Sequence, residues 1–166
     1  MKSFYLICIL GIYVSSCSCF KPNTFGPSEC IIKNVEYQDD FLYSSKEIEY
    51  GVRDQRRKVY SNPVSTKYMR HSNQKKWIFI PVDENGKEMS SNNTFYIVNG
   101  QYIEFLCAST DHLEITKRRR KIYTLNLDET KVQDECKWRL DPVKTRNDGY
   151  VIWNLKYKEP LYAASR

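Results

Sequence analysis

Short apolar runs separated by polar, turn-forming stretches make up the chain from about residue 30 onward. The runs are rich in Ile, Val, Tyr, Trp and Leu, whereas the intervening stretches, such as DENGK, SSNN and TRNDG, carry Gly, Asn, Asp and Ser. Within YIVN at 96–99 and VIWN at 151–154, successive side chains alternate between two faces, which is the period of a half-buried strand. The sequence has no long amphipathic pattern with helical spacing. This pattern predicts an all-β fold.

One phrase occurs three times along the chain. The stretches CIIKNVEYQDDFLYSS at 30–45, FYIVNGQYIEFLCAS at 95–109 and YVIWNLKYKEPLYAAS at 150–165 align on a shared Asn. An Ile precedes each Asn by two residues, a Tyr follows it by three, and a Leu comes further on. The aligned positions are Ile32, Ile97 and Ile152; Asn34, Asn99 and Asn154; Tyr37, Tyr102 and Tyr157; and Leu42, Leu106 and Leu161. Such a repeat predicts equivalent places in one fold.

Two further segments lie between the copies of this phrase. RRKVY at 56–60 matches RRKIY at 119–123, and KWIFIPV at 76–82 matches KWRLDPV at 137–143. Each repeat unit therefore has four strand-like segments, and the second pair does not follow the third copy. An open barrel edge at this place would be costly. Either residues 20–29 cover it, a partner chain completes it, or the fold departs from a complete threefold arrangement.

Four strands per unit with a Trp on the fourth resemble the β-trefoil fold, in particular the repeats of ricin-B-type lectins. That family carries Gln, any residue and Trp on the fourth strand, whereas Lys75 and Cys136 stand two residues before Trp77 and Trp138 here. The resemblance implies a pseudo-threefold, β-trefoil-like domain with an incomplete third unit, whose loops carry a binding function. The Asp, aromatic and Asn constellation of the family's sugar sites has no clear copy in this chain.

The first residues have the pattern of a secretory signal peptide. Lys2 precedes an apolar run from Phe4 to Val14, and the small-residue stretch SSCSC follows. The run is too short to cross a bilayer comfortably, and a buried helix is the alternative. We therefore predict a signal peptide at 1–19, a single domain at 20–166, and a secreted, extracellular protein without stable membrane insertion.

Secretion bears on the cysteines, because disulfides persist in oxidising compartments. Cys30, Cys107 and Cys136 are the disulfide candidates that stay with the predicted domain. One disulfide and one thiol follow if cleavage comes after Cys19, whereas earlier cleavage leaves four cysteines and room for two bridges. The spacing does not select a pairing.

Basic residues gather in two segments. The net charge is +6, and it falls to +5 when Lys2, the only charged side chain before Phe20, is removed. The segments RDQRRK and KRRRK align in the repeat, so we predict that they form an anion- or glycan-binding surface. Its candidates are Arg53, Arg56, Arg57, Lys58, Lys117, Arg118, Arg119, Arg120 and Lys121. The alternative is a pair of solvated strand ends whose charges discourage edge pairing.

Catalysis and metal binding find little support in the sequence. The chain has two histidines, His71 and His112, and lacks HExxH, GxSxG and Gly-rich phosphate motifs. Cys107 and His112 could form a thiol and base pair, but a disulfide is favoured for Cys107. We expect no enzyme activity, no cofactor and no metal site. Asn92 begins an Asn-Asn-Thr sequon and is a glycosylation candidate, used or unused.

Two functions fit these features. The first is a secreted, non-enzymatic module that docks on glycosaminoglycans or anionic cell surfaces through the basic segments. The alternative is a ligand or antagonist of a protein receptor, as cytokine-type trefoils are, in which loops and exposed aromatic residues bind. The composition also resembles small basic proteins of insect saliva or haemolymph, which implies a salivary effector that acts on a host. A dimer could form through the incomplete barrel edge or a thiol.

Overall fold

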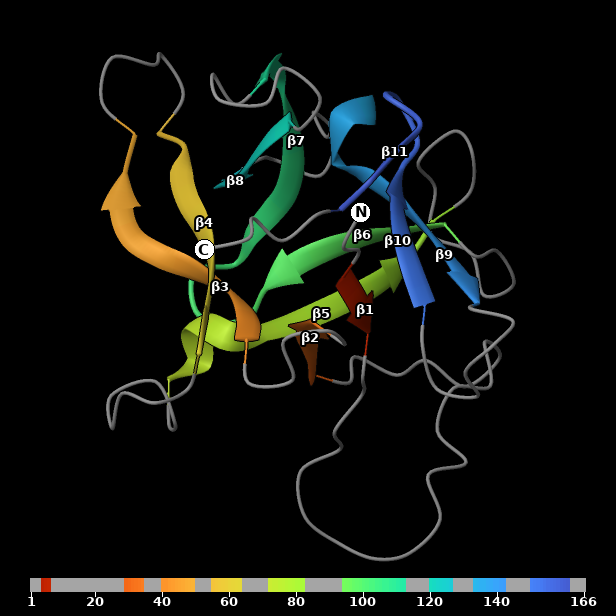
Figure 1. The fold of residues 1–166 in the computed structure, drawn as a ribbon. Helices are drawn as coiled ribbons and strands as arrows, with labels where there is room; N and C mark the ends of the chain where they lie inside the picture. Colours follow the sequence, from red (N-terminus) through yellow and green to blue (C-terminus); the bar gives the residue numbers. More distant parts are fainter. Residues whose placement is uncertain are drawn as a thin grey trace, which may run out of the picture.

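The computed structural model describes residues 4–6, 29–34, 40–49, 55–63, 72–82, 94–112, 120–126, 133–142 and 150–161. Most of them lie in short strands (Figure 1). The only helices in these ranges are two 3-10 turns, so the predicted all-β fold is confirmed. In chain order the elements are β1 (Phe4–Leu6), β2 (Glu29–Asn34), β3 (Asp40–Ile48), β4 (Arg57–Pro63), η1 (Asn73–Lys75), β5 (Lys76–Pro81), β6 (Thr94–Asn99), β7 (Glu104–His112), β8 (Arg120–Leu125), η3 (Asp134–Cys136), β9 (Lys137–Pro142), β10 (Tyr150–Asn154) and β11 (Glu159–Pro160).

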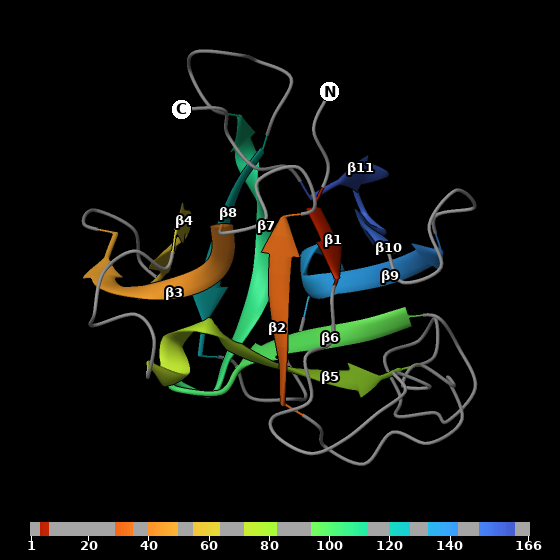
Figure 2. The ribbon, with the colours of Figure 1, turned by 60° about the horizontal axis from the view of Figure 1, so that its bottom comes forward.

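The strands pair antiparallel and close on themselves. The order β2-β3-β4-β8-β7-β6-β5 returns to β2 and forms a seven-stranded barrel. A second circuit runs from β6 through β9, β10 and β1 back to β2. Strands β5 and β6 belong to both circuits, and Figure 2 shows them side by side in the lower part of the view. The pseudo-threefold arrangement with an incomplete third unit stays a prediction.

Strand β6, which belongs to both circuits, buries both of its faces. In β6, Phe95 and Ile97 belong to a large apolar cluster that also takes residues from β2, β3, β5, β7, β9 and β10. Tyr96 and Val98, on the other face of β6, pack in a second cluster with residues of β7 and β8. This alternation is the one predicted for YIVN from its period of two, but the prediction of a half-buried strand is wrong for β6, because neighbouring strands and side chains cover both of its faces.

The two tryptophans of the repeated KW segments make the same contact. Trp77 donates its indole N–H to the carbonyl oxygen of Leu42 at 2.9 Å, and Trp138 donates to that of Leu106 at 2.8 Å. Both indoles are fully buried, where an N–H group without an acceptor would cost about 1–3 kcal/mol. Leu42 and Leu106 are themselves aligned in the repeat, so these two copies of the sequence repeat are equivalent in their packing.

Two of the three repeated asparagines, Asn99 and Asn154, each close a turn. The side-chain amide of Asn99 donates to the carbonyl oxygen of Gln74 at 2.8 Å, and that of Asn154 to Glu135 at 2.7 Å. Each amide oxygen also accepts the backbone N–H three residues later, at 3.2 and 3.1 Å. Both side chains are buried with these polar groups satisfied. At these two positions, the Asn ties the turn after one strand to the 3-10 turn before another.

Ile103, in the turn after β6, carries backbone strain. Its φ is 54° and its side chain is 63% exposed, although a branched side chain disfavours positive φ. We predict that Ile103→Asn raises the free energy of unfolding by about 1 kcal/mol, because Asn tolerates this conformation. Urea denaturation measures the change. Lys158, with a φ of 53°, is the matched control, and Lys158→Asn should gain less since Lys is unbranched. A loss of stability in the Ile103 variant would contradict the prediction.

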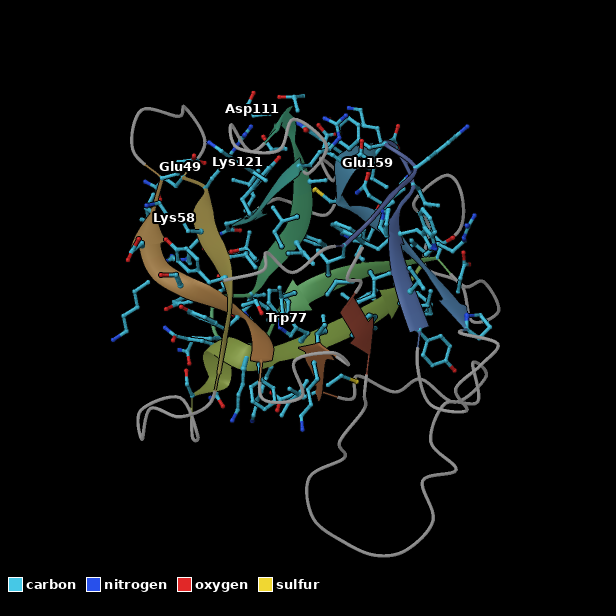
Figure 3. All side chains as sticks on the ribbon, in the orientation of Figure 1. Glu49, Lys58, Trp77, Asp111, Lys121 and Glu159 are labelled. Carbon is cyan, nitrogen blue, oxygen red and sulfur yellow. A yellow bond between two sulfur atoms is a disulfide. The ribbon has the colours of Figure 1, made fainter. Side chains whose placement is uncertain are left out.

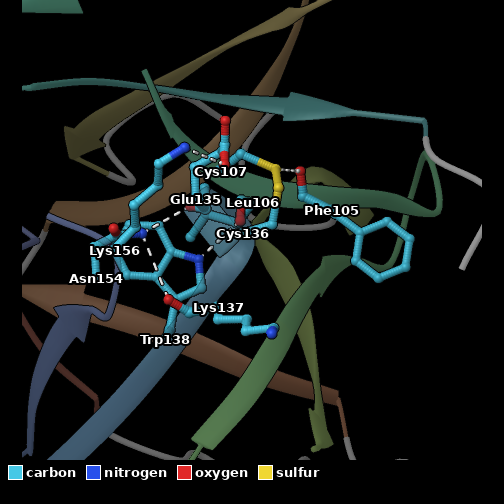
Figure 4. The surroundings of a disulfide bond; sticks show 9 residues. All are labelled: Phe105, Leu106, Cys107, Glu135, Cys136, Lys137, Trp138, Asn154 and Lys156. Carbon is cyan, nitrogen blue, oxygen red and sulfur yellow. Dashed lines mark hydrogen bonds and ion pairs between the residues drawn. A yellow bond between two sulfur atoms is a disulfide. The ribbon is translucent and has the colours of Figure 1, made fainter. Parts of the chain in front are cut away.

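One disulfide joins β7 to η3. Cys107 and Cys136 are bonded across a sequence separation of 29, and both are buried (Figure 4). This pairing selects one of the combinations that the spacing left open. Cys30 is only 4% exposed within the barrel core, so its thiol cannot reach a second chain unless β2 opens. The other three cysteines lie outside the described residues.

Three predictions concern segments that the structure covers in part or not at all. Asn92 lies outside the described residues. Of the predicted signal peptide, only β1 is described, and it pairs with both β2 and β10. The division into 1–19 and 20–166 stays a prediction. The described part of the chain holds no helix with the length and apolar character to span a bilayer.

Candidate anion-binding surface

The two basic segments lie on neighbouring strands. β4 begins at Arg57 and β8 at Arg120, and the strands pair antiparallel with Arg57 opposite Thr124 and Lys58 opposite Tyr123. The structure thus pairs strands from the first and second repeat units, and in this antiparallel register Arg57 stands opposite Thr124 rather than opposite its aligned residue Arg120. The structure describes five of the nine candidates, namely Arg56, Arg57, Lys58, Arg120 and Lys121. The other four lie outside the described residues, namely Arg53, Lys117, Arg118 and Arg119.

Arg57 points inward and is held by a buried carboxylate. Its Nε lies 3.0 Å from both carboxylate oxygens of Glu104, and one terminal nitrogen donates to the carbonyl oxygen of Lys46 at 3.2 Å. The guanidinium also stacks over Tyr102, 4.0 Å from the ring centroid. Thr124 donates to the same carboxylate at 2.6 Å. With its side chain 18% exposed and its charge compensated, Arg57 is poorly placed to meet a ligand.

Arg120 repeats this arrangement in the next unit. Its Nε lies 3.2 Å from a carboxylate oxygen of Glu159, and its guanidinium carbon lies 3.7 Å from the ring centroid of Tyr157. One terminal nitrogen donates to the carbonyl oxygen of Thr110 at 2.9 Å. Here the carboxylate is more open, because the side chain of Glu159 is 30% exposed whereas that of Glu104 is 6% exposed. Both arginines fasten a strand to the turn that follows a repeated Asn.

A small cavity lies beside Arg120. Trp138, Asn154 and Glu159 also line it, and its volume is about 20 Å³. This volume is enough for about one water molecule. It is too small for a sugar ring, so a glycan that meets this part of the chain would lie on a surface rather than in this cavity.

The face of the β4–β8 pair that is turned away from Arg57 and Arg120 carries three other cations. They are Arg56, Lys58 and Lys121, and we call them the outer cationic face. Lys58 stands directly opposite Tyr123, so the two side chains share a face, and Lys121 shares it because it lies two residues before Tyr123. Arg56 stacks over the same ring at 4.3 Å from its centroid. The side chain of Lys58 is 45% exposed. Figure 3 shows Lys58 and Lys121 near β4 and β8.

One carboxylate, that of Glu47, partly neutralises the positive charge of the outer cationic face. Glu47 accepts hydrogen bonds from Tyr60 at 3.0 Å and from Lys58 at 3.2 Å. The pKa of Glu47 is lowered by the hydrogen bond from Tyr60 and then by Lys58, and the pKa of Lys58 is raised by its bond to Glu47. These groups are exposed, and exposed pairs contribute little stability. A polyanion can therefore replace Glu47 as the partner of Lys58 at small cost.

The sequence reasoning missed a second group of cations, the lysine cluster formed by Lys33, Lys75 and Lys76. The ammonium nitrogens of Lys33 and Lys75 lie 5.0 and 5.5 Å from the ring centroid of Phe41, and Lys76 pairs with Glu29 at 2.7 Å. Burial lowers the pKa of Lys75, and repulsion from Lys33 and then Lys76 lowers it further. The run NQKKW was the only sequence signal, because Lys33 is remote along the chain.

The other chemical candidates do not assemble into a site. Cys107 is in a disulfide, so it cannot act as the thiol of a Cys107 and His112 pair. Among the described ranges, no three side chains of His, Cys, Asp or Glu gather closely enough to hold a metal ion. Among the predicted site residues that the structure describes, the basic residues are the ones that gather on a common surface.

No protein-family model matches the chain, and no curated protein matches it significantly. The function has to be inferred from the surface itself.

Proposed function

We propose that this protein is a secreted, non-enzymatic β-trefoil module that docks on sulfated glycans or other anionic surfaces. The outer cationic face makes the contact, and Arg53 and Lys117 to Arg119, predicted from the sequence to bind anions, lie outside the described residues. The observation that carries the proposal is that Arg56, Lys58 and Lys121 share one face of two paired strands while Arg57 and Arg120 are turned away and neutralised. Sulfate groups bind such cations through charge-assisted hydrogen bonds.

Secretion is supported by two independent features. The first residues carry the charge, apolar run and small residues of a signal peptide. Cys107 and Cys136 form a buried disulfide, which is typical of proteins that fold in an oxidising compartment. In that setting the abundant polyanions are glycosaminoglycans and anionic cell surfaces, and delivery in insect saliva onto a host would place the protein among them.

The trefoil assignment is supported by equivalent contacts in two repeat units. The tryptophan bonds to Leu42 and Leu106, the asparagine turns, and the two Arg-Tyr-carboxylate groups recur in the same order along the chain. A trefoil presents its turns and hairpins as a rigid scaffold, so a cationic face on the paired strands β4 and β8 is a natural docking surface.

A protein receptor is the second candidate, and two exposed side chains favour it. Ile103 is 63% exposed at the tip of a strained turn, and Tyr60 is 37% exposed on β4. An exposed aliphatic group and a Tyr are common anchors of protein interfaces. Such binding would depend weakly on salt, whereas docking on a sulfated glycan weakens steeply as salt rises.

A heparin column with a salt gradient tests the proposal. The variant Arg56→Gln, Lys58→Gln and Lys121→Gln should elute at clearly lower salt than the wild type, because it loses the outer cationic face. The matched control is Arg139→Gln, Lys156→Gln and Lys158→Gln, which removes the same charge from exposed positions on β9 and after β10. It should elute close to the wild type. Equal shifts in both variants, or early elution of the wild type, would overturn the proposal.

A further inference from the structure

β1 occupies a gap that has a strand on either side. Its residues pair antiparallel with β2, with Tyr5 opposite Lys33 and Leu6 opposite Ile32, and Tyr5 is also opposite Val151 of β10. Figure 2 shows β1 beside β2, on the side toward β9 and β10. An inserted strand therefore finds backbone partners along both of its edges, unlike a strand added to the outside of a sheet.

The walls of this gap are part of the barrel core. Ile32 of β2 and Ile152 of β10 are both fully buried, and both belong to the large apolar cluster. An empty gap would expose the apolar side chains around Ile32 and Ile152 to water. It would also leave backbone N–H and C=O groups of β2 and β10 without partners. Unpaired groups of this kind on an apolar edge recruit further strands.

We propose that the gap between β2 and β10 is a binding site for an extended segment of a partner protein, which inserts antiparallel to both strands. The inference rests on the proposed secretion, because β1 lies within residues 1–19 and leaves the gap when the signal peptide is removed. A second copy of the chain is a poor donor, since the described strands from β2 to β11 already pair within their own barrel.

The walls also define the chemistry of the inserted segment. A residue opposite Ile32 shares its buried face and has to be apolar. The neighbouring residue, opposite Lys33, lies on the other face, where the lysine cluster attracts a carboxylate. The residue at this central position needs its backbone N–H, which excludes proline. The site therefore selects a segment in which an acidic residue directly precedes an apolar one.

Peptide binding to the secreted protein tests this site. The full chain is expressed with export, and mass spectrometry of the product reads its first residue. The probes are the peptide KSFYLI, which has the sequence of residues 2–7, and its Tyr5→Glu and Tyr5→Pro forms. In a titration, the Tyr5→Glu peptide should bind about threefold more tightly than KSFYLI. The Tyr5→Pro peptide should bind at least about tenfold more weakly, because it loses a ladder hydrogen bond.

Charge reversal provides the control within the protein. Lys33→Glu should invert the preference, so that KSFYLI binds better than its Tyr5→Glu form, while near-ultraviolet circular dichroism checks that the barrel is intact. If no peptide binds to a product that begins after residue 19, or if the proline form binds equally well, the site is refuted while secretion stands. A product that still begins at Met1 would refute an open gap and signal removal together, whatever its behaviour on heparin.

Discussion

Trp138→Ala will lower the free energy of unfolding by about 3–5 kcal/mol, which is the usual cost of emptying a large aromatic site in a core. Trp138 is 1% exposed, and its indole N–H is bonded to Leu106 at 2.8 Å. The substitution therefore leaves both a cavity and a buried carbonyl oxygen that has lost this donor. Urea denaturation of the oxidised protein measures the change.

Trp138→Phe retains part of the packing while it removes the hydrogen bond. Phenylalanine keeps one aromatic ring in the core but lacks the indole N–H and the rest of the fused ring, so the loss should be smaller than for Trp138→Ala, at about 1–2 kcal/mol. Because Trp77 makes the equivalent bond to Leu42, the corresponding pair of variants at Trp77 should give similar losses. A loss below about 1 kcal/mol for Trp138→Ala would contradict the packing described for the barrel.

Glu104→Gln is expected to cost about 3 kcal/mol, because it leaves the guanidinium of Arg57 without its countercharge in a largely buried place. The side chain of Glu104 is 6% exposed and accepts bonds from both Arg57 and Thr124. Thermal and urea unfolding of the variant, measured beside the wild type at neutral pH, give the difference.

Glu159→Gln is the matched control for this effect. Glu159 pairs with Arg120 in the corresponding place of the next unit, but its side chain is 30% exposed. Solvent screens this pair more strongly, so the loss should stay below about 1 kcal/mol. Equal losses at Glu104 and Glu159 would show that burial does not set the strength of these pairs.

Local patterns were sufficient to predict the strands and which of their side chains share a face. The period of two in YIVN placed Ile97 and Val98 on opposite faces, and they belong to separate apolar clusters. The KW segments were predicted to be equivalent, and Trp77 and Trp138 make equivalent bonds. These features depend on near neighbours and on simple burial, which a sequence displays directly.

The partition of the basic residues could not be predicted from the runs alone. Arg56, Arg57 and Lys58 are adjacent, yet Arg57 meets the buried Glu104 while Lys58 faces solvent. A signal for this was present, because a Glu follows the repeated Tyr by two residues at Tyr102 and again two residues after Tyr157. Its meaning depends on which strand lies beside that turn, and only the three-dimensional pairing reveals it.

The place of β1 was also beyond local reasoning. An apolar run after a single Lys has the composition of a signal peptide whether or not it can pair with a sheet. The pairing of Tyr5 with Lys33 and Val151 depends on the gap between β2 and β10, which are remote from each other in sequence. That β1 lies between β2 and β10 could therefore be seen only in the folded chain.

The salt dependence of binding to a heparin oligosaccharide is the decisive measurement for the outer cationic face. The logarithm of the association constant should fall linearly with the logarithm of salt concentration, and the slope should shrink by about two to three in the Arg56, Lys58 and Lys121 variant. The desulfated oligosaccharide should bind weakly. A slope that is the same in the wild type and this variant, or equal binding with and without sulfate, would contradict docking on sulfated glycans through this face.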